Sequence, residues 1–135
     1  MEKSIAIMAI INFVIMGLSH IFQHQSWKEF FLLLASKGRA GAFANGFLTL
    51  VMGSLIVSFH NVWSGLPVIL TLLGWAYVLK STVIFLHPEW NVKSMAGVEH
   101  APTLKFRVAG LCLLSIAAVL AVCIVTDGYS TTVNF

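Results

Sequence analysis

The stretch VAGLCLLSIAAVLAVCIV, from Val108 to Val125, contains no charged residue and no proline. A helix of this length is long enough to cross the roughly 30 Å hydrocarbon core of a bilayer. Three further stretches are apolar and almost free of charge, at residues 4–22, 40–59 and 66–86. The sequence therefore predicts an all-α integral membrane protein, a bundle of four transmembrane helices in a single domain over residues 1–135.

The composition of the whole chain agrees with this prediction. Hydrophobic residues make up 59% of the sequence and charged residues 10%, which is far from the balance of a soluble globular protein. The formal net charge of +3 is no sign of nucleic-acid binding, because the basic residues flank the predicted spans. That position is typical of topology signals and of contacts with anionic lipids. The expected partner is therefore the lipid bilayer, and nucleic acid is excluded.

Basic residues gather on one side of the predicted bundle. If successive spans alternate in direction, the connectors at 23–39 and 87–107 lie on the same side. These connectors contain Lys28, Lys37, Arg39, Lys93, Lys105 and Arg107. The opposite side has Lys3. The positive-inside rule then predicts that the connectors are cytoplasmic and both termini external, with a bacterial inner membrane as the expected location.

Residues at the span ends fit this orientation. Lys80 falls within the last two turns of the third span, from where its side chain can reach the cytoplasmic headgroups. Trp27, Trp63 and Trp90 lie beside span ends and are interpreted as interfacial anchors. The short segment HNVWSG at 60–65 predicts that the second and third spans are antiparallel neighbours.

A short motif occurs twice. IFQHQSW at 21–27 and IFLHPEW at 84–90 share the pattern I-F-x-H-x-x-W, and each is followed by a K-x-R pair and another span. Because the first and third spans run in the same direction, a duplication would give two parallel helical hairpins related by a twofold axis along the membrane normal. Chance matches are also expected in so narrow a composition, so duplication and coincidence both remain open.

The connector after the first span contains a helix start signal. Ser26 and Glu29 match the S-x-x-E capping box, and an apolar run follows up to Ala35. Gly38 is suited to the position just after the helix end. These features predict a short interfacial helix at about 27–36. Pro88 marks the stop of the third span.

Three histidines are the candidate cofactor ligands. His20 and His24 are four residues apart and share one face of a helix, and His87 is expected on the same side of the membrane. Such a set fits a metal ion, or a haem held between the first and third spans. The favoured interpretation is that these are interfacial residues at helix ends and that no cofactor is bound, because H-x-x-x-H alone is a weak motif.

Small and weakly polar residues within the spans are predicted to serve helix packing, because they let membrane helices approach closely. They are Gly46, Gly53, Asn45, Thr49 and Gly110.

The functional expectation rests on what the spans lack. No acidic residue lies inside any span, whereas small four-span multidrug transporters depend on an embedded carboxylate. No nucleophile elbow, P-loop or zinc-protease motif is present. We therefore expect a non-enzymatic protein, an accessory or structural subunit of a larger membrane assembly or a self-associating bundle. The alternatives are a haem- or metal-binding redox module, and a transporter or channel with Asn12, Asn45, Thr49 and Lys80 along an oligomer axis.

Overall fold

The computed structural model describes residues 1–126, and all secondary structure within them is helical. The helices are α1 (Glu2–Phe22), α2 (His24–Ser36), α3 (Arg39–Phe59), α4 (Val68–Leu86), α5 (Pro88–Ala96), the short 3₁₀ helix η1 (Gly97–His100) and α6 (Thr103–Val125). Four of them, α1, α3, α4 and α6, are long and apolar enough to cross a membrane. The predicted all-α fold with four long apolar helices is confirmed.

Some predicted boundaries differ from the observed ones. Helix α2 begins at His24 and not at Trp27, because the chain bends only at Gln23. Ser26 is thus inside the helix and provides no cap, so the capping-box prediction was wrong. Gly38 follows the end of α2 with a φ of 59°, as expected for a glycine just past a helix end. Helix α6 begins five residues before the predicted span, at Thr103.

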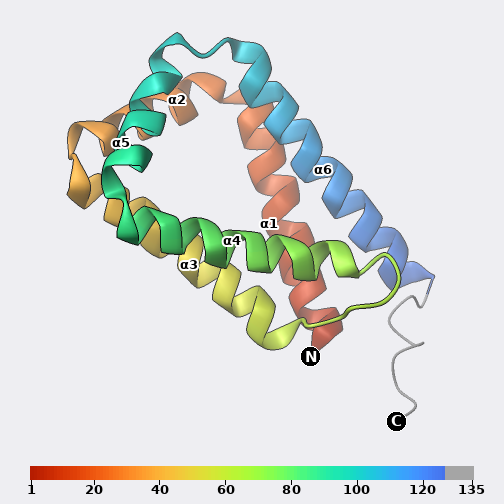
Figure 1. Cartoon of the computed structure of the whole chain (residues 1–135). Helices are drawn as coiled ribbons and strands as arrows, with labels where there is room; N and C mark the ends of the chain where they lie inside the picture. The colour runs from red at the N-terminus through yellow and green to blue at the C-terminus, as the bar shows by residue number, and fades with distance from the viewer. Residues whose placement is uncertain (127–135) are drawn as a thin grey trace.

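The long helices form two pairs. Helix α1 packs along α6, and α3 packs along α4. Figure 1 shows the two pairs close together near the N-terminus and separated at the other end, where α2 and α5 lie. The predicted antiparallel contact between the second and third spans is therefore present. The first and second spans do not form the hairpin that a duplication would give, because α2 lies between α1 and α3 along the chain and these two long helices make few contacts.

Two clusters of buried side chains fill the ends of this arrangement. The larger one lies where the four long helices meet and includes Ala9, Phe13, Ile56, Leu70 and Leu120. The smaller one lies at the separated end, where Ala42, Ile84 and Met95 contact side chains of α2. We call the end of the molecule that contains the larger cluster the loop end, because the α3–α4 loop lies there. We call the end that contains the smaller cluster the basic end.

Glycines allow the close approach within each pair. A Cβ atom at Gly110 of α6 would lie 2.5 Å from the carbonyl oxygen of Gly17 in α1. A Cβ atom at Gly46 of α3 would lie 2.9 Å from the Ile84 side chain of α4, and one at Gly53 would lie 2.9 Å from the backbone nitrogen of Val78. Both pairs therefore bring helix backbones closer than any larger residue would permit.

The two halves of the chain have the same plan, with a separation of 64 residues. In the first half, the segment that connects the two long helices begins at His24 and ends at Ser36, and the next long helix begins at Arg39. In the second half, the same boundaries fall at Pro88, His100 and Thr103. The buried positions of α3 and α6 follow the same register, in the pairs Ala42/Phe106, Gly46/Gly110, Gly53/Ala117 and Ile56/Leu120. Because α1 pairs with α6 and α3 with α4, each half places its first long helix against the last one of the other half.

This register differs from the one the motif suggested. His24 and His87 are 63 residues apart, so the two copies of I-F-x-H-x-x-W are shifted by one residue relative to the helices. His87 caps α4, whereas Gln23 occupies the same place after α1. The K-x-R pairs do not correspond either, since Lys37 caps α2 whereas Lys105 lies in the first turn of α6.

The loop end is closed by a buried polar cluster. Thr71 of α4 donates to the carbonyl oxygen of Val62 at 2.8 Å and accepts from the Val62 N–H at 3.0 Å. The Nδ1 atom of His60, whose side chain is fully buried, lies 3.2 Å from the Thr71 hydroxyl. Burial lowers the pKa of His60 below 6.5, against the opposing effects of its backbone hydrogen bond and of Glu2. The loop is thus held to α4 by hydrogen bonds that compensate for its burial.

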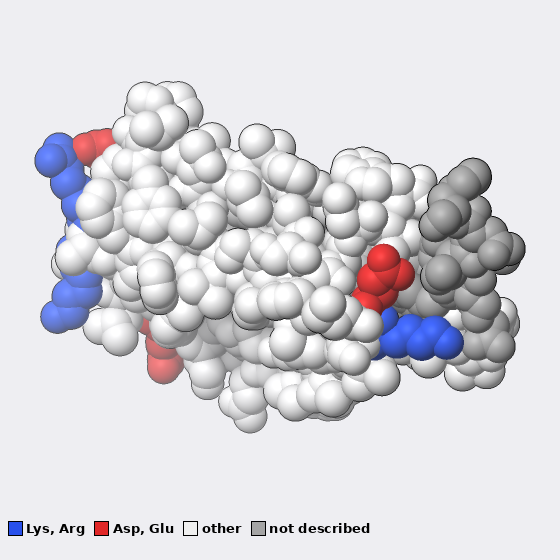
Figure 2. Space-filling view, turned by 90° about the horizontal axis from the view of Figure 1, so that it is seen from below, with Lys and Arg blue, Asp and Glu red and all other residues white. Residues whose placement is uncertain are grey.

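Charged side chains lie at the two ends of the molecule. Figure 2 shows Lys, Arg, Asp and Glu near both ends of the face it presents, with an uncharged flank between them. The structure brings Lys28, Lys37, Arg39, Lys93, Lys105 and Arg107 to the basic end, because α1 and α4 end there while α3 and α6 begin there. An uncharged flank between charged ends is expected of a protein surrounded by lipid. Lys80, which is exposed within the last two turns of α4, departs from this pattern.

Candidate functional site

A cavity of about 600 Å³ lies between the two helix pairs. Its lining comes from α1, α2, α3, α4 and α6, and consists of Asn12, Phe13, Met16, His20, Trp27, Phe30, Phe31, Asn45, Leu48, Thr49, Met52, Tyr77, Lys80, Ala109, Cys112 and Leu113. Leu48 is 57% exposed although it lines the cavity, so the cavity is open to the surroundings of the protein. We call this space the central cavity.

The internal repeat relates opposite walls of the central cavity. Ten of its lining residues form five pairs that are 64 residues apart, namely Phe13/Tyr77, Met16/Lys80, Asn45/Ala109, Leu48/Cys112 and Thr49/Leu113. Corresponding positions of the two halves therefore face the same space. The central cavity lies between the halves, where the axis relating them would pass.

The chemistry of the two walls is different. In four of the five pairs the residue on α3 or α4 is the more polar one, with Tyr77, Lys80, Asn45 and Thr49 opposite Phe13, Met16, Ala109 and Leu113. Asn12 and His20 of α1 also line the cavity, but each bonds a carbonyl oxygen of its own helix, since the Asn12 amide donates to Met8 O and His20 Nδ1 lies 2.8 Å from Met16 O. The central cavity thus has one polar wall and one largely apolar wall.

Hydrogen bonds fix the polar wall. The Asn45 amide donates to the Asn91 side-chain oxygen of α5 at 3.2 Å, which joins the wall to the basic end. Thr49 donates to the Asn45 carbonyl oxygen at 2.8 Å, so its hydroxyl oxygen can still accept a hydrogen bond. Asn45 and Thr49 were predicted to serve helix packing or, in the transporter alternative, to line a polar path, and the structure places both on this wall, beside Gly46, which contacts α4.

Aromatic side chains cover the central cavity at the basic end. The indole N–H of Trp27 donates to the Ser19 hydroxyl at 2.8 Å, and its ring stacks on His20 with centroids 4.2 Å apart. Phe30 and Phe31 contact Trp27 at centroid distances of 5.8 and 6.0 Å. Trp27 therefore holds α2 to α1 and lines the central cavity.

Lys80 lies between two spaces. It lines the central cavity, and it also lines an adjoining pocket of about 290 Å³ with Val83, Ile84, His87, Trp90 and Asn91. His87 stacks on Trp90 at a centroid distance of 4.6 Å. Lys80 therefore lies where the central cavity meets a largely apolar pocket at the basic end, which also contains the polar side chains of His87 and Asn91.

The three predicted histidine ligands do not converge. His20 lines the central cavity, where its Nδ1 lies 2.8 Å from the carbonyl oxygen of Met16. His87 lines the adjoining pocket, and His24 lines neither space; its buried Nδ1 has no hydrogen-bond partner. Among residues 1–126, no three His, Cys, Asp or Glu side chains are grouped so that they could hold a metal ion.

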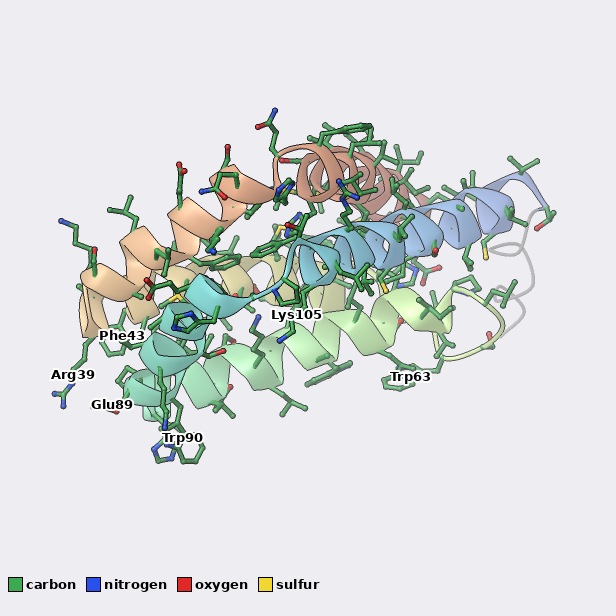
Figure 3. All side chains as sticks on the ribbon, turned by 90° about the horizontal axis from the view of Figure 1, so that it is seen from above. Arg39, Phe43, Trp63, Glu89, Trp90 and Lys105 are labelled. Carbon is green, nitrogen blue, oxygen red and sulfur yellow. The ribbon has the colours of Figure 1, made fainter. Side chains whose placement is uncertain are left out.

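Other predicted site residues lie on the outside of the molecule. Trp63 is 61% exposed in the α3–α4 loop, and Trp90 is 65% exposed on α5. Figure 3 shows Trp63 far from Trp90, which lies near Arg39 and Glu89. Arg39 and Glu89 form an ion pair at 2.7 Å that joins α3 to α5, and because both side chains are largely exposed it contributes at most about 1 kcal/mol.

Sequence reasoning missed most of the aromatic lining. Tyr77, Phe30 and Phe31 were not singled out because aromatic residues are frequent throughout this chain. A 64-residue register would have indicated Tyr77 as the counterpart of the buried Phe13, but the more visible motif gave a register of 63.

Comparison of the chain with protein-family models, curated proteins and solved structures finds no match.

Proposed function

We propose that the chain is a non-enzymatic integral membrane protein that binds a small amphipathic molecule in the central cavity. The observation that carries this proposal is the pairing of a polar wall with an apolar wall in one cavity of about 600 Å³. That volume is within the range of small-molecule sites, roughly 300–1,000 Å³. A molecule with a polar group at one side and an apolar body at the other satisfies both walls.

The cost of polar groups in a membrane supports the same proposal. Side chains such as Asn45, Tyr77 and Lys80 are expensive within lipid and are usually found where they face a partner or a water-filled space. The transporter alternative placed Asn12, Asn45, Thr49 and Lys80 along an oligomer axis. Because one chain already collects these four residues around one cavity, ligand binding requires no oligomer.

The orientation and location proposed for the protein follow from its charges. We propose that the basic end is cytoplasmic in a bacterial inner membrane, because six basic residues lie at that end. An amphipathic ligand would then have its polar group nearer the cytoplasmic surface. Labelling of single introduced cysteines in intact cells tests this orientation independently of binding.

The accessory-subunit interpretation stays a prediction. It is compatible with ligand binding, because the exposed outer faces of the helix pairs are separate from the central cavity. Mass spectrometry of proteins that co-elute in mild detergent addresses it directly.

Filling the central cavity is expected to abolish binding. Ala109→Trp adds a large side chain to the wall, whereas Val108→Trp adds the same side chain at a neighbouring position that is 48% exposed and lines no pocket described above. Native mass spectrometry should detect a small-molecule adduct on the wild-type chain and on Val108→Trp, and its loss from Ala109→Trp. The proposal fails if the wild type carries no adduct, or if Ala109→Trp carries as much as Val108→Trp.

A further inference from the structure

We infer that the ligand of the central cavity is an anionic single-chain lipid whose carboxylate or phosphate pairs with Lys80. This inference rests on the proposed function. It specifies the charge of the ligand, the residue that binds the headgroup and the wall that receives the acyl chain.

The first reason is the missing counter-charge of Lys80. Among the described residues 1–126, Lys80 has no ion-pair partner and no hydrogen-bond partner. The acidic residues of this part of the chain are Glu2, Glu29, Glu89 and Glu99, and none lies within a predicted span. Lys80 is exposed within the last two turns of α4, so its ammonium group is able to reach an anionic partner in the space that it lines. An anionic ligand would provide that partner.

The second reason is the set of donors beside Lys80. Tyr77 lies one turn earlier on α4, and Asn45 lies on the neighbouring helix of the same wall. His87 and Asn91 line the adjoining pocket together with Lys80. Ammonium, phenol, amide and imidazole groups can all donate hydrogen bonds, and an anionic oxygen accepts several of them at once.

The third reason is the position of Lys80 relative to its counterpart. The register of 64 residues pairs Lys80 with Met16, which is on the opposite wall. One half thus presents a cation where the other presents an apolar side chain. With Phe13 and Leu113 on the same wall as Met16, the acyl chain has an apolar surface opposite the headgroup site.

The route into the cavity also favours a lipid. Leu48 and Met16 line the central cavity and are 57% and 39% exposed, on helices that have the length and apolar character to span a membrane. A lipid in the surrounding bilayer could therefore enter from the side. A fatty acid and a lysophospholipid share the required chemistry, one acyl chain with an anionic headgroup, and they are separated by experiment.

The test uses three radiolabelled probes with the same acyl chain. Oleate, oleoyl lysophosphatidate and methyl oleate are bound at equilibrium to the full chain in nanodiscs of zwitterionic phosphatidylcholine. The wild type should bind at least one of the two acids about tenfold or more tightly than the ester, as expected for a charge-assisted pair formed away from water. The acid that binds more tightly identifies the headgroup.

Matched variants isolate the contribution of Lys80. Lys80→Met, which introduces the residue of the opposite wall, should lower the affinity for that acid to the level of the ester. Lys80→Arg should retain the preference for the acid. Lys93→Met removes a positive charge on α5 that lies outside both spaces, and should change nothing. Unchanged ester binding by Lys80→Met shows that this variant is folded.

The outcomes separate this inference from the proposed function. Equal affinity of the wild type for acid and ester, or equal acid binding by the wild type and Lys80→Met, would overturn the anionic ligand while the adduct experiment on Ala109→Trp still tests the cavity. Absence of an adduct on the wild type, together with absence of binding by all three probes, would overturn both the anionic ligand and the proposed binding function.

Discussion

Replacement of Gly110 with alanine is expected to separate α1 from α6 and to lower the stability of the protein by about 3 kcal/mol, at the upper end of the usual cost of overpacking. The added Cβ atom would lie 2.5 Å from the carbonyl oxygen of Gly17 and 2.8 Å from the side chain of Ile21. The nearer atom belongs to helix backbone, which cannot move away without displacing α1. The measurement is thermal or denaturant unfolding of the purified protein in detergent.

Gly97→Ala is the matched control. Gly97 has a φ of −61°, and apart from its neighbours along the chain no atom lies within 4 Å of the position of its Cβ. The same substitution there should therefore leave stability unchanged or raise it by about 0.4–1 kcal/mol, because alanine restricts the unfolded chain. Equal unfolding midpoints for Gly110→Ala and Gly97→Ala would show that α1 and α6 do not approach as closely as described.

Replacement of Gly41 with alanine is expected to disturb the basic end more strongly than Gly110→Ala does. The new Cβ atom would overlap the backbone carbonyl group of Leu34, because the first turn of α3 lies directly against the last turns of α2. Relief of that overlap requires α2 to move, and with it Phe31, which lines the central cavity. We expect a loss of at least about 3 kcal/mol and, in addition, weakened retention of any bound molecule.

Two readouts distinguish this effect from a general loss of stability. Unfolding of Gly41→Ala reports the overlap, and proteolysis of the α2–α3 connection reports displacement of α2. Wild-type stability together with wild-type protection from protease would contradict the tight junction of α2 and α3. Gly97→Ala again gives the reference for a glycine in open space.

The four long helices could be predicted from the sequence because the physical signal is strong. Charged residues are so costly in hydrocarbon that a stretch such as residues 108–125 is distinctive by itself. The antiparallel contact of α3 and α4 could also be predicted from the sequence, because the loop at 60–67 is too short for any other arrangement. The turns at Gly38 and Pro88 could be predicted as well, because few residue types suit those positions.

The pairing of the helices could not be predicted in this way. Membrane-spanning helices are apolar on all sides, so their sequences do not indicate which face meets a neighbour. Gly46 and Gly110 were recognised as packing residues, yet their partners, Ile84 and the backbone of Gly17, became known only with the structure. The central cavity depends on that pairing, so the sequence alone could not show that Asn45 and Thr49 line it.

The repeated motif led to the wrong register for a related reason. Identical letters in I-F-x-H-x-x-W drew attention to His24 and His87, while the correspondence of the helices involves different residue types such as Gln23 and His87. At equivalent backbone positions of a repeat, the two side chains need to be similar in size and in burial, but the two residues need not be identical. Gly46/Gly110 is one pair in which the 64-residue register also preserves identity, and both of its glycines lie at close helix contacts.

The central claim is that the long helices pair across the two halves and so enclose the central cavity, and disulfide crosslinking in native membranes tests it most directly. In a chain without Cys112 and Cys123, Gly46→Cys should crosslink to Ile84→Cys, because the Cβ positions are 3.5 Å apart. Gly17→Cys should likewise crosslink to Leu114→Cys, whose Cγ position is 2.9 Å from the Gly17 Cβ position. Gly17→Cys and Gly46→Cys face different partners and should not crosslink. A bridge between positions 17 and 46, with none between 17 and 114, would contradict the pairing and the central cavity with it.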